Sequence, residues 1–129
     1  MKNILVVDDD RDLCDLISEI VSDEGFSVQK AYNGFAALEK MNKFNFDLLI
    51  IDNRLAGLSG ISVLENIQRK KVIPKTIMMS AYGNKRIKNL ARDFGVVKFI
   101  DKPFDIAKLI NIVNKVLNSI ECINLSFIF

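Results

Sequence analysis

Acidic residues follow two apolar runs of this sequence. Ile4–Val7 leads directly into Asp8–Asp10, and Leu48–Ile51 ends on Asp52. If both runs are parallel strands of one sheet, their carboxyl ends lie side by side and the carboxylates share one small pocket. Two like charges ~4 Å apart repel by roughly 4 kcal/mol at an effective dielectric constant near 20, so the pocket requires a compensating cation. The sequence therefore predicts a divalent metal site.

The residue types of the chain limit what this pocket can do. Histidine is absent, and the two cysteines, Cys14 and Cys122, form no C-x-x-C pair. Thiolate or imidazole metal sites and histidine-based nucleophilic catalysis are therefore excluded. Cys14 lies on a predicted helix face, and we interpret it as a small buried hydrophobic residue. The groups that remain available for chemistry are side chains with oxygen atoms and the ammonium of lysine.

Length and composition indicate one domain with a full core. The chain has 129 residues, half of them hydrophobic, and a formal net charge of +2, which suits a sheet covered on both faces. The small charge gives no reason to expect direct nucleic-acid binding, and solvated helix ends explain the basic clusters Arg69–Lys71 and Lys85–Lys88 more simply. Four apolar residues before Asp8 are too few for a signal peptide or a membrane span, so we expect a cytoplasmic protein.

Strand and helix patterns alternate along nearly the whole chain. We expect strands at residues 3–8, 27–31, 47–52, 76–80 and 96–100. Apolar residues recur at helical spacing after each strand, including Leu16 in the first helix and Phe35 in the second. Asp105 is a predicted N-cap of the last helix, whose apolar side reaches Ile120. Such alternation implies an α/β fold with a mostly parallel sheet and helices on both faces.

Residues that could do chemistry gather at one edge of this sheet. Asp8 and Asp9 follow the first strand, and Asp52 ends the third. Ser80 ends the fourth strand, and Lys102 follows the fifth. Ligands of parallel sheets bind beyond the carboxyl ends of the strands, so an acid, a hydroxyl and an ammonium are expected in one ligand site.

In this order and on these strand ends, the motifs resemble the receiver domain of two-component response regulators. The resemblance covers residues 2 to about 119 and is carried by Val6-Val7-Asp8-Asp9, Leu49-Ile50-Ile51-Asp52 with Gly57 and Gly60 behind it, Met79-Ser80-Ala81, and Asp101-Lys102-Pro103-Phe104. It implies a doubly wound (βα)5 flavodoxin-like sandwich with five parallel strands in the order 2-1-3-4-5. Residues 1–119 would be the receiver domain, and residues 120–129 an apolar tail of unknown role.

The resemblance also implies a magnesium site. Asp9 would bind Mg²⁺ directly and Asp8 through a water, while Asp52 and the backbone carbonyl of Arg54 would add further oxygens. Mg²⁺ in proteins takes one or two carboxylates, keeps several waters and receives its remaining ligand from phosphate. An acid pair beside an acceptor carboxylate suits that preference.

Phosphoryl chemistry is assigned by the same resemblance. Asp52 would be the phosphoacceptor, Ser80 would hydrogen-bond a phosphoryl oxygen, and Lys102 would pair with the phosphoryl charge. Phosphorylation should draw Ser80 inward and leave room for the family's switch aromatic, Phe99, to turn in behind it. Pro103 corresponds to the family's cis proline, which aims the preceding lysine inward. The surface of the fourth helix, fifth strand and fifth helix would carry the output.

The loop beyond Asp52 departs from the family pattern at two positions. Ala56 stands where proline is usual, and Ser59 where aspartate is frequent. Gly57 and Gly60, which serve backbone conformation, are retained. These departures loosen the loop but remove no reactive group.

The function implied is that of a signalling phosphoacceptor and not of an enzyme, since it would catalyse only its own phosphorylation and dephosphorylation. A sensor histidine kinase would supply the phosphoryl group, and a downstream phosphotransferase or other protein would be the second partner. The stretches around Ser80 and Lys102 resemble stand-alone members such as the sporulation phosphorelay intermediate and the chemotaxis response regulator. Arg54 and Tyr82 occupy positions that tune attack by water on the phosphoaspartate, and because both are bulky we expect a long-lived phosphoryl group.

Other interpretations compete with this one. Asp8 and Asp10 mimic the D-x-D pair of haloacid-dehalogenase-like phosphatases, but these need a late acid pair for the metal, and the acids here are dispersed over Asp93, Asp101, Asp105 and Glu121. A receiver-like binding module that never takes phosphate is a third possibility. Capping of the first helix is a simpler role than metal ligation for Asp10 and Asp12.

Overall fold

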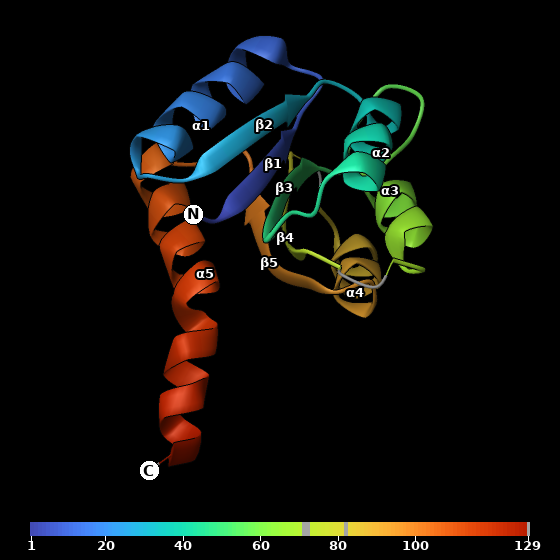
Figure 1. Cartoon of the computed structure of the whole chain (residues 1–129). Helices are drawn as coiled ribbons and strands as arrows, with labels where there is room; N and C mark the ends of the chain where they lie inside the picture. The colour runs from blue at the N-terminus through green and yellow to red at the C-terminus, as the bar shows by residue number, and fades with distance from the viewer. Residues whose placement is uncertain (71–72, 82, 129) are drawn as a thin grey trace.

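A parallel sheet forms the centre of the molecule (Figure 1). The computed structural model describes residues 1–70, 73–81 and 83–128, with side chains described up to residue 118. Within these residues the sheet has five strands, β1 (Asn3–Val7), β2 (Ser27–Ala31), β3 (Leu48–Asp52), β4 (Lys75–Ser80) and β5 (Val96–Asp101). Their order is β2-β1-β3-β4-β5, and every pair is parallel. The predicted fold class and strand order are confirmed.

Helices cover both faces of the sheet, as Figure 1 shows. On one face, α1 (Arg11–Asp23) and α5 (Ile106–Ile128) pack against side chains of β1, β3 and β4. On the other face lie α2 (Gly34–Lys43), α3 (Gly60–Ile67) and α4 (Lys85–Asp93). The central strand β3 is buried along its whole length, and β1 and β4 are buried after their first residues, because both faces of the sheet are covered. This burial explains the apolar runs Ile4–Val7 and Leu48–Ile51.

Helix N-caps lie just beyond the carboxyl ends of the strands. In each case a short polar side chain accepts a backbone N–H of the first helical turn, and these side chains are Asp10, Asn33, Ser59, Asn84 and Asp105. Such caps satisfy amide groups that the helix itself leaves without a partner. The capping roles predicted for Asp10 and Asp105 are therefore confirmed, and the caps fix the loops at the edge where the functional residues lie.

Three apolar residues predicted at helical spacing are exposed instead. Leu16 is 45% exposed, Phe35 is 63% exposed, and Leu90, expected on the stripe of the fourth helix, is 36% exposed. In α1 the buried residues include Cys14 and Ser18, and Leu16, two positions from each, lies on the opposite side of a helix with 3.6 residues per turn. Strand limits differ from the predicted ones by at most one residue at either end.

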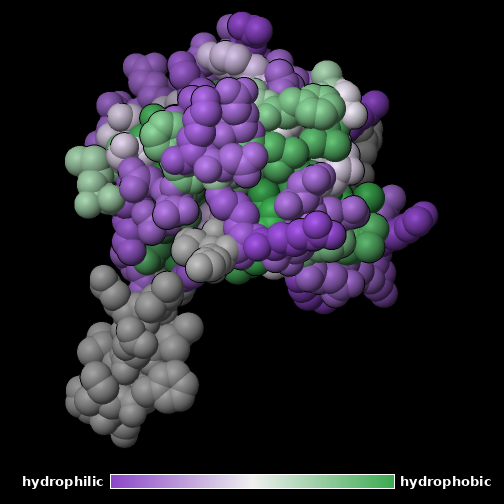
Figure 2. All heavy atoms as spheres, turned by 45° about the vertical axis from the view of Figure 1, so that its right-hand side comes forward, coloured by the Kyte–Doolittle hydropathy of each residue, from purple (hydrophilic) through white to green (hydrophobic). Residues whose placement is uncertain are grey.

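Two features lie outside the sheet, namely a mostly hydrophilic surface and a long last helix. Hydrophilic side chains cover most of the face drawn in Figure 2, with hydrophobic ones showing between them. Helix α5 continues across the predicted boundary at residue 119, and its last turns extend past the sheet in Figure 1. The predicted buried position of Ile120 lies outside the described side chains. None of the helices in the described residues is long and apolar enough to cross a membrane.

Candidate functional site

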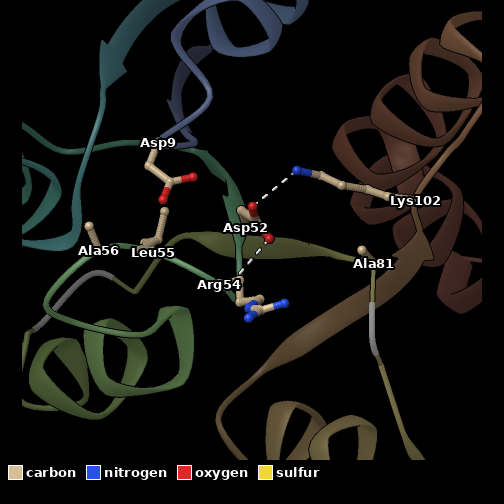
Figure 3. A pocket seen from close by; sticks show the side chains of 7 residues that line it. All are labelled: Asp9, Asp52, Arg54, Leu55, Ala56, Ala81 and Lys102. Atoms are coloured by element: carbon tan, nitrogen blue, oxygen red, sulfur yellow. Dashed lines mark hydrogen bonds and ion pairs between the residues drawn. The ribbon is translucent and has the colours of Figure 1, made fainter.

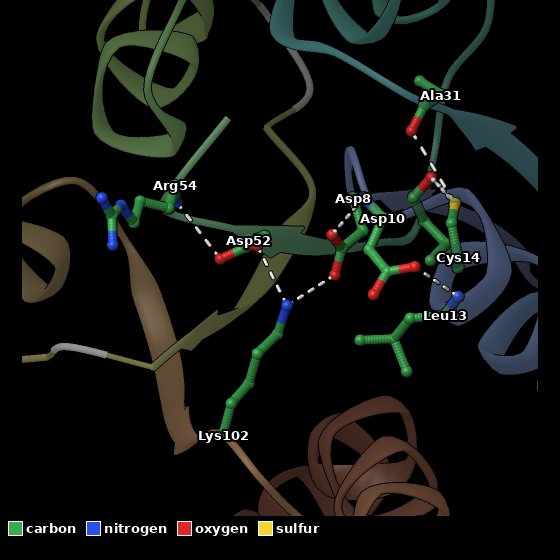
Figure 4. A network of polar contacts seen from close by, with 9 residues as sticks. Asp8, Asp10, Leu13, Cys14, Ala31, Asp52, Arg54 and Lys102 are labelled. Atoms are coloured by element: carbon green, nitrogen blue, oxygen red, sulfur yellow. Dashed lines mark hydrogen bonds and ion pairs between the residues drawn. The ribbon is translucent and has the colours of Figure 1, made fainter. Parts of the chain in front are cut away.

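A lysine bridges two buried carboxylates at the carboxyl end of the sheet. Asp8 follows β1, Asp52 ends β3, and Lys102 follows β5. The Lys102 Nζ donates to Asp8 Oδ2 at 2.7 Å and to Asp52 Oδ2 at 3.0 Å (Figure 4). The side chains are 0% (Asp8), 7% (Asp52) and 17% (Lys102) exposed. Three distant segments therefore meet in one charged cluster, which we call the buried triad.

Asp9 adds a third carboxylate beside the triad. One oxygen each of Asp8, Asp9 and Asp52 lies within 4.8 Å of the others, and these three form the acidic group found in the described part of the chain. Asp9 and Asp52 line a pocket of about 390 Å³, into which the Asp9 carboxylate points (Figure 3). Oxygen ligands at this separation suit a hard divalent cation such as Mg²⁺. The donor set thus fits the predicted metal.

The pKa shifts in the triad follow from burial and pairing. Burial raises the pKa of Asp8 above its ordinary value, even though the hydrogen bond from Lys102 acts in the opposite direction. Burial alone would lower the pKa of Lys102, but the hydrogen bonds and charges of Asp8 and Asp52 outweigh it and raise that pKa. Lys102 is therefore a firmly protonated ammonium. Three carboxylates against this one ammonium leave the site short of positive charge.

Backbone amides hold the second oxygen of each buried carboxylate. Asp8 Oδ1 accepts the N–H of Asp10 at 3.0 Å, and Asp52 Oδ1 accepts the N–H of Arg54 at 3.2 Å. Each carboxylate is thus fixed on one side by its own loop and on the other by Lys102. This arrangement orients the acids before any ligand arrives.

Close packing at Gly60 positions the start of α3 against the strand that ends on Asp52. A Cβ added at Gly60 would lie 2.7 Å from the Asp52 carbonyl oxygen and 2.9 Å from Asn53 Cα. The Gly60 N–H donates to Asn53 O at 2.9 Å. Gly57, with φ +80°, adopts a left-handed conformation in the same loop. A side chain at either position would displace the loop that carries Arg54.

The remaining residues proposed from the sequence lie around this edge. Ser80 is 2% exposed at the end of β4, and its carbonyl accepts the Lys102 N–H at 2.8 Å. The peptide bond between Lys102 and Pro103 is cis. Phe99 is half-buried on β5 and pairs with Met78 of β4. Tyr82 lies outside the described residues.

Three apolar residues of the pocket were not among the site residues predicted from the sequence. Leu55, Ala56 and Ala81 line the pocket together with Arg54 (Figure 3). Each stands next to a motif residue, and that proximity in sequence is the signal that could have identified them. They make one wall of an otherwise charged pocket apolar.

Comparison with known proteins identifies the family of the chain. Residues 4–114 match the family described as "Response regulator receiver domain". The match covers far more than half of the 129 residues. The chain belongs to the response regulator receiver domain family.

Two bacterial proteins are among the curated relatives of this receiver domain. It is 34% identical over 119 residues to "Sporulation initiation phosphotransferase F" of Bacillus subtilis (strain 168), covering 90% of this chain and 94% of that protein. It is 33% identical over 117 residues to "Transcriptional regulatory protein CpxR homolog" of Haemophilus influenzae, covering 91% of this chain and 51% of that protein. The receiver domain thus spans nearly the whole of the first relative and about half of the second.

Solved structures share the fold over most of the chain. A receiver domain protein described as CheY-like, from Methanospirillum hungatei JF-1, superposes with a TM-score of 0.88 at 27% identity, covering 94% of this chain and 97% of that one. The response regulator TrrA of Thermotoga maritima, solved "in complex with Mg(2+)-BeF", gives a TM-score of 0.78 at 34% identity, covering 90% and 99%. The family predicted from the sequence is confirmed.

The phosphatase alternative receives no support from these comparisons. The geometry agrees, because Asp93, Asp101 and Asp105 are not members of the acidic group found in the described residues. Among the described side chains, which do not include Glu121, the late acid pair that such a phosphatase needs is therefore not gathered at the site.

Proposed function

We propose that this receiver domain accepts a phosphoryl group on Asp52 from the phosphohistidine of a sensor histidine kinase. The observation that supports it best is the buried triad, in which Asp52 lies at the pocket with a protonated lysine 3.0 Å from its Oδ2. A carboxylate is a competent nucleophile toward phosphorus when nearby positive charge stabilises the transferred group.

The transfer step is an in-line displacement at phosphorus. A carboxylate oxygen of Asp52 forms the new O–P bond while the P–N bond to the kinase imidazole breaks, and the imidazole nitrogen leaves with the electron pair. Lys102 stabilises the negative charge of the phosphoryl oxygens, because its ammonium already lies against Asp52. Ser80, at the end of the neighbouring strand β4, would donate its hydroxyl to a phosphoryl oxygen.

Asp8, Asp9 and Asp52, with the backbone carbonyl of Arg54, are the proposed ligands of Mg²⁺. The support is the 4.8 Å grouping of three carboxylate oxygens beside the pocket. When bound, Mg²⁺ supplies positive charge that neutralises the phosphoryl oxygens. The chain's own part is to hold these oxygens on fixed loops through the amides of Asp10 and Arg54.

The output proposed for phosphorylation is a change at α4, β5 and α5. Ser80 would move toward the phosphoryl group and the ring of Phe99 would turn in behind it. The next partner would be a protein that reads this surface or a phosphotransferase that takes the phosphoryl group onward. The name of the Bacillus subtilis relative, a phosphotransferase, supports the second of these. The bulk of Arg54 and Tyr82 suggests slow loss of the phosphoryl group to water.

A small-molecule phosphodonor tests the proposal without the kinase. The chain is incubated with acetyl phosphate and Mg²⁺, and intact mass is followed. We expect a gain of one phosphoryl group that requires Mg²⁺ and disappears in Asp52→Asn, but persists in Asp23→Asn, which neutralises an exposed acid at the end of α1. Turnover of a phosphate ester without a stable mass gain would favour the phosphatase, and absence of any modification would favour the unphosphorylated binding module.

A further inference from the structure

The proposed switch residue Phe99 lies on the same side of the sheet as α4. On β5, Phe99 and Asp101 are two positions apart and pair with Met78 and Ser80 of β4. Since side chains alternate along a strand, all four belong to one face. Met78 of β4 and Ala91 of α4 belong to the core cluster of that face, and Phe99 packs against this cluster. The ring therefore lies on the face of the sheet that α4 covers.

Lys88 of α4 contacts both Phe99 and Asp101. Its Nζ lies 5.3 Å from the centroid of the Phe99 ring and 3.6 Å from Asp101 Oδ2. The first distance is within the range of a cation–π interaction. The Lys88 and Asp101 side chains are 40% and 67% exposed, so their ion pair contributes little by itself. Its effect is to hold the ammonium over the face of the ring.

Gly83 lies against the same ring and leaves no room there for a side chain. A Cβ added at Gly83 would lie 2.5 Å from Phe99 Cε1 and 2.8 Å from Phe99 Cζ. Real Cβ atoms do not approach a ring carbon so closely, so any side chain at this position would displace the ring. The ring lies against a bare Cα on one side and has an ammonium over its face. We call Gly83, Lys88 and Asp101 the ring seat.

We propose that Gly83 and Lys88 are positioning residues that hold Phe99 in the position seen here and so set how readily phosphorylation of Asp52 switches the domain. The inference rests on the proposed function and adds the residues that control it. When Ser80 moves and the ring leaves the seat, Lys88 loses its aromatic partner.

Release of Lys88 would also change the surface that a partner meets. Lys88, Arg92 and Lys98 line one depression beside β5, together with Val97 and Phe99. Once the ring has turned, the ammonium keeps only its exposed ion pair with Asp101, and a partner's acid can replace that carboxylate. A change in the ring position is thus transmitted through Lys88 to the outer surface of α4.

The test places 4-fluorophenylalanine at Phe99 and records its ¹⁹F resonance with and without beryllofluoride and Mg²⁺. We expect the ¹⁹F resonance to lie at two different positions, one in the resting protein and one with beryllofluoride and Mg²⁺ bound. Lys88→Met should move the resting spectrum toward the beryllofluoride environment. By linkage it should also raise the apparent beryllofluoride affinity roughly two- to fivefold, the factor that a surface cation–π contact of about 0.5–1 kcal/mol represents.

Matched variants separate positioning from general charge. Lys88→Arg, which keeps a cation over the ring, should restore the resting spectrum. Lys85→Met removes the same charge from an exposed position of α4 and should leave it unchanged. Gly83→Ala should shift the spectrum by displacing the ring sterically, whereas Lys88→Met involves an exposed side chain and keeps the fold, as circular dichroism will verify.

The experiment distinguishes failure of this inference from failure of the proposed function. If the wild-type protein responds to beryllofluoride while Lys88→Met has the wild-type spectrum and affinity, the ring seat has no positioning role and the inference is overturned alone. If the wild-type protein shows neither a beryllofluoride response nor a phosphoryl mass gain, the proposed function is overturned and the inference with it.

Discussion

Two clusters of charged side chains in this receiver domain have similar distances but different surroundings. In the buried triad, Lys102 lies 2.7 Å and 3.0 Å from Asp8 and Asp52. On the outer surface, Asp15 of α1 accepts the Tyr32 hydroxyl at 2.6 Å and pairs with Lys30 of β2 at 3.1 Å. We call Asp15, Lys30 and Tyr32 the surface cluster. Its Lys30 and Asp15 side chains are 43% and 49% exposed.

The carboxylates Asp8 and Asp15 have pKa shifts of opposite sign. Burial raises the pKa of Asp8 despite its lysine partner. The hydrogen bonds from Tyr32 and Lys30 lower the pKa of Asp15, because the smaller effect of desolvation does not outweigh them. An N···O distance near 3 Å therefore does not by itself tell whether a carboxylate is stabilised as an anion. Burial decides whether the anion is stabilised, and the carboxylates of the buried triad are the ones that require a further cation.

The largest expected difference between the clusters is in phosphorylation. Lys102→Met should slow labelling by acetyl phosphate roughly 100-fold, the typical loss when one charge-stabilising donor is removed. Lys30→Met should label at the wild-type rate because Lys30 belongs to the surface cluster. The measurement is the rate of phosphoryl mass gain at fixed Mg²⁺. Equal rates for the two variants would remove Lys102 from the mechanism.

The second-largest difference between the clusters is expected in the effect of Mg²⁺ on stability. At Mg²⁺ concentrations about 100 times the dissociation constant, the wild-type free energy of unfolding should rise by about 2.7 kcal/mol. Asp9→Asn should abolish this gain and slightly stabilise the metal-free domain, since one of three neighbouring carboxylates is neutralised. Asp15→Asn should keep the full gain. Denaturant unfolding with Mg²⁺ and with chelator gives both values, and a retained gain in Asp9→Asn contradicts the assignment.

Acidification should act on the two clusters in opposite directions when a chelator is present. The pKa of Asp8 is higher in the folded state than its ordinary value of 3.8, so its contribution to stability is present below that value and is lost as pH rises through the folded pKa. The pKa of Asp15 is lower than 3.8 when folded, so its contribution is present above that value and is lost as pH falls through the folded pKa. Melting temperatures of Asp8→Asn and Asp15→Asn across this pH range should diverge from wild type with opposite slopes. Parallel slopes would contradict the comparison.

The smallest expected effect lies within the surface cluster. The hydrogen bond to Asp15 is the main cause that raises the pKa of Tyr32 above 10.0. Asp15→Asn should therefore return the phenol titration toward its ordinary value, measured by ultraviolet absorbance in a Tyr82→Phe background. An unchanged titration would show that the Asp15 contact is not maintained in solution.

Much of this architecture could be predicted because it depends on local patterns. Apolar runs bounded by Gly25, Gly95 and Pro74 gave the strands to within a residue. The rule that ligands bind at the carboxyl ends of parallel strands then predicts that Asp8, Asp52 and Lys102 share one edge of the sheet. Helical periodicity was less reliable for Leu16 and Phe35, because an apolar residue at helical spacing is buried only where a neighbouring element covers it.

The contacts between distant segments could not be predicted in the same way. That Lys102 bridges Asp8 and Asp52, 94 and 50 positions away, depends on strand register and side-chain direction in three loops. Nothing in the sequence distinguished Gly83 and Lys88 from an ordinary loop glycine and a solvated lysine, and only the packing of β5 against α4 brought both to Phe99. The sequence by itself determined the elements and the kinds of chemical group at the edge of the sheet, since these follow from local periodicity and strand order. Tertiary structure alone decided which groups touch and which carboxylates are shielded from water, because both depend on how the layers pack.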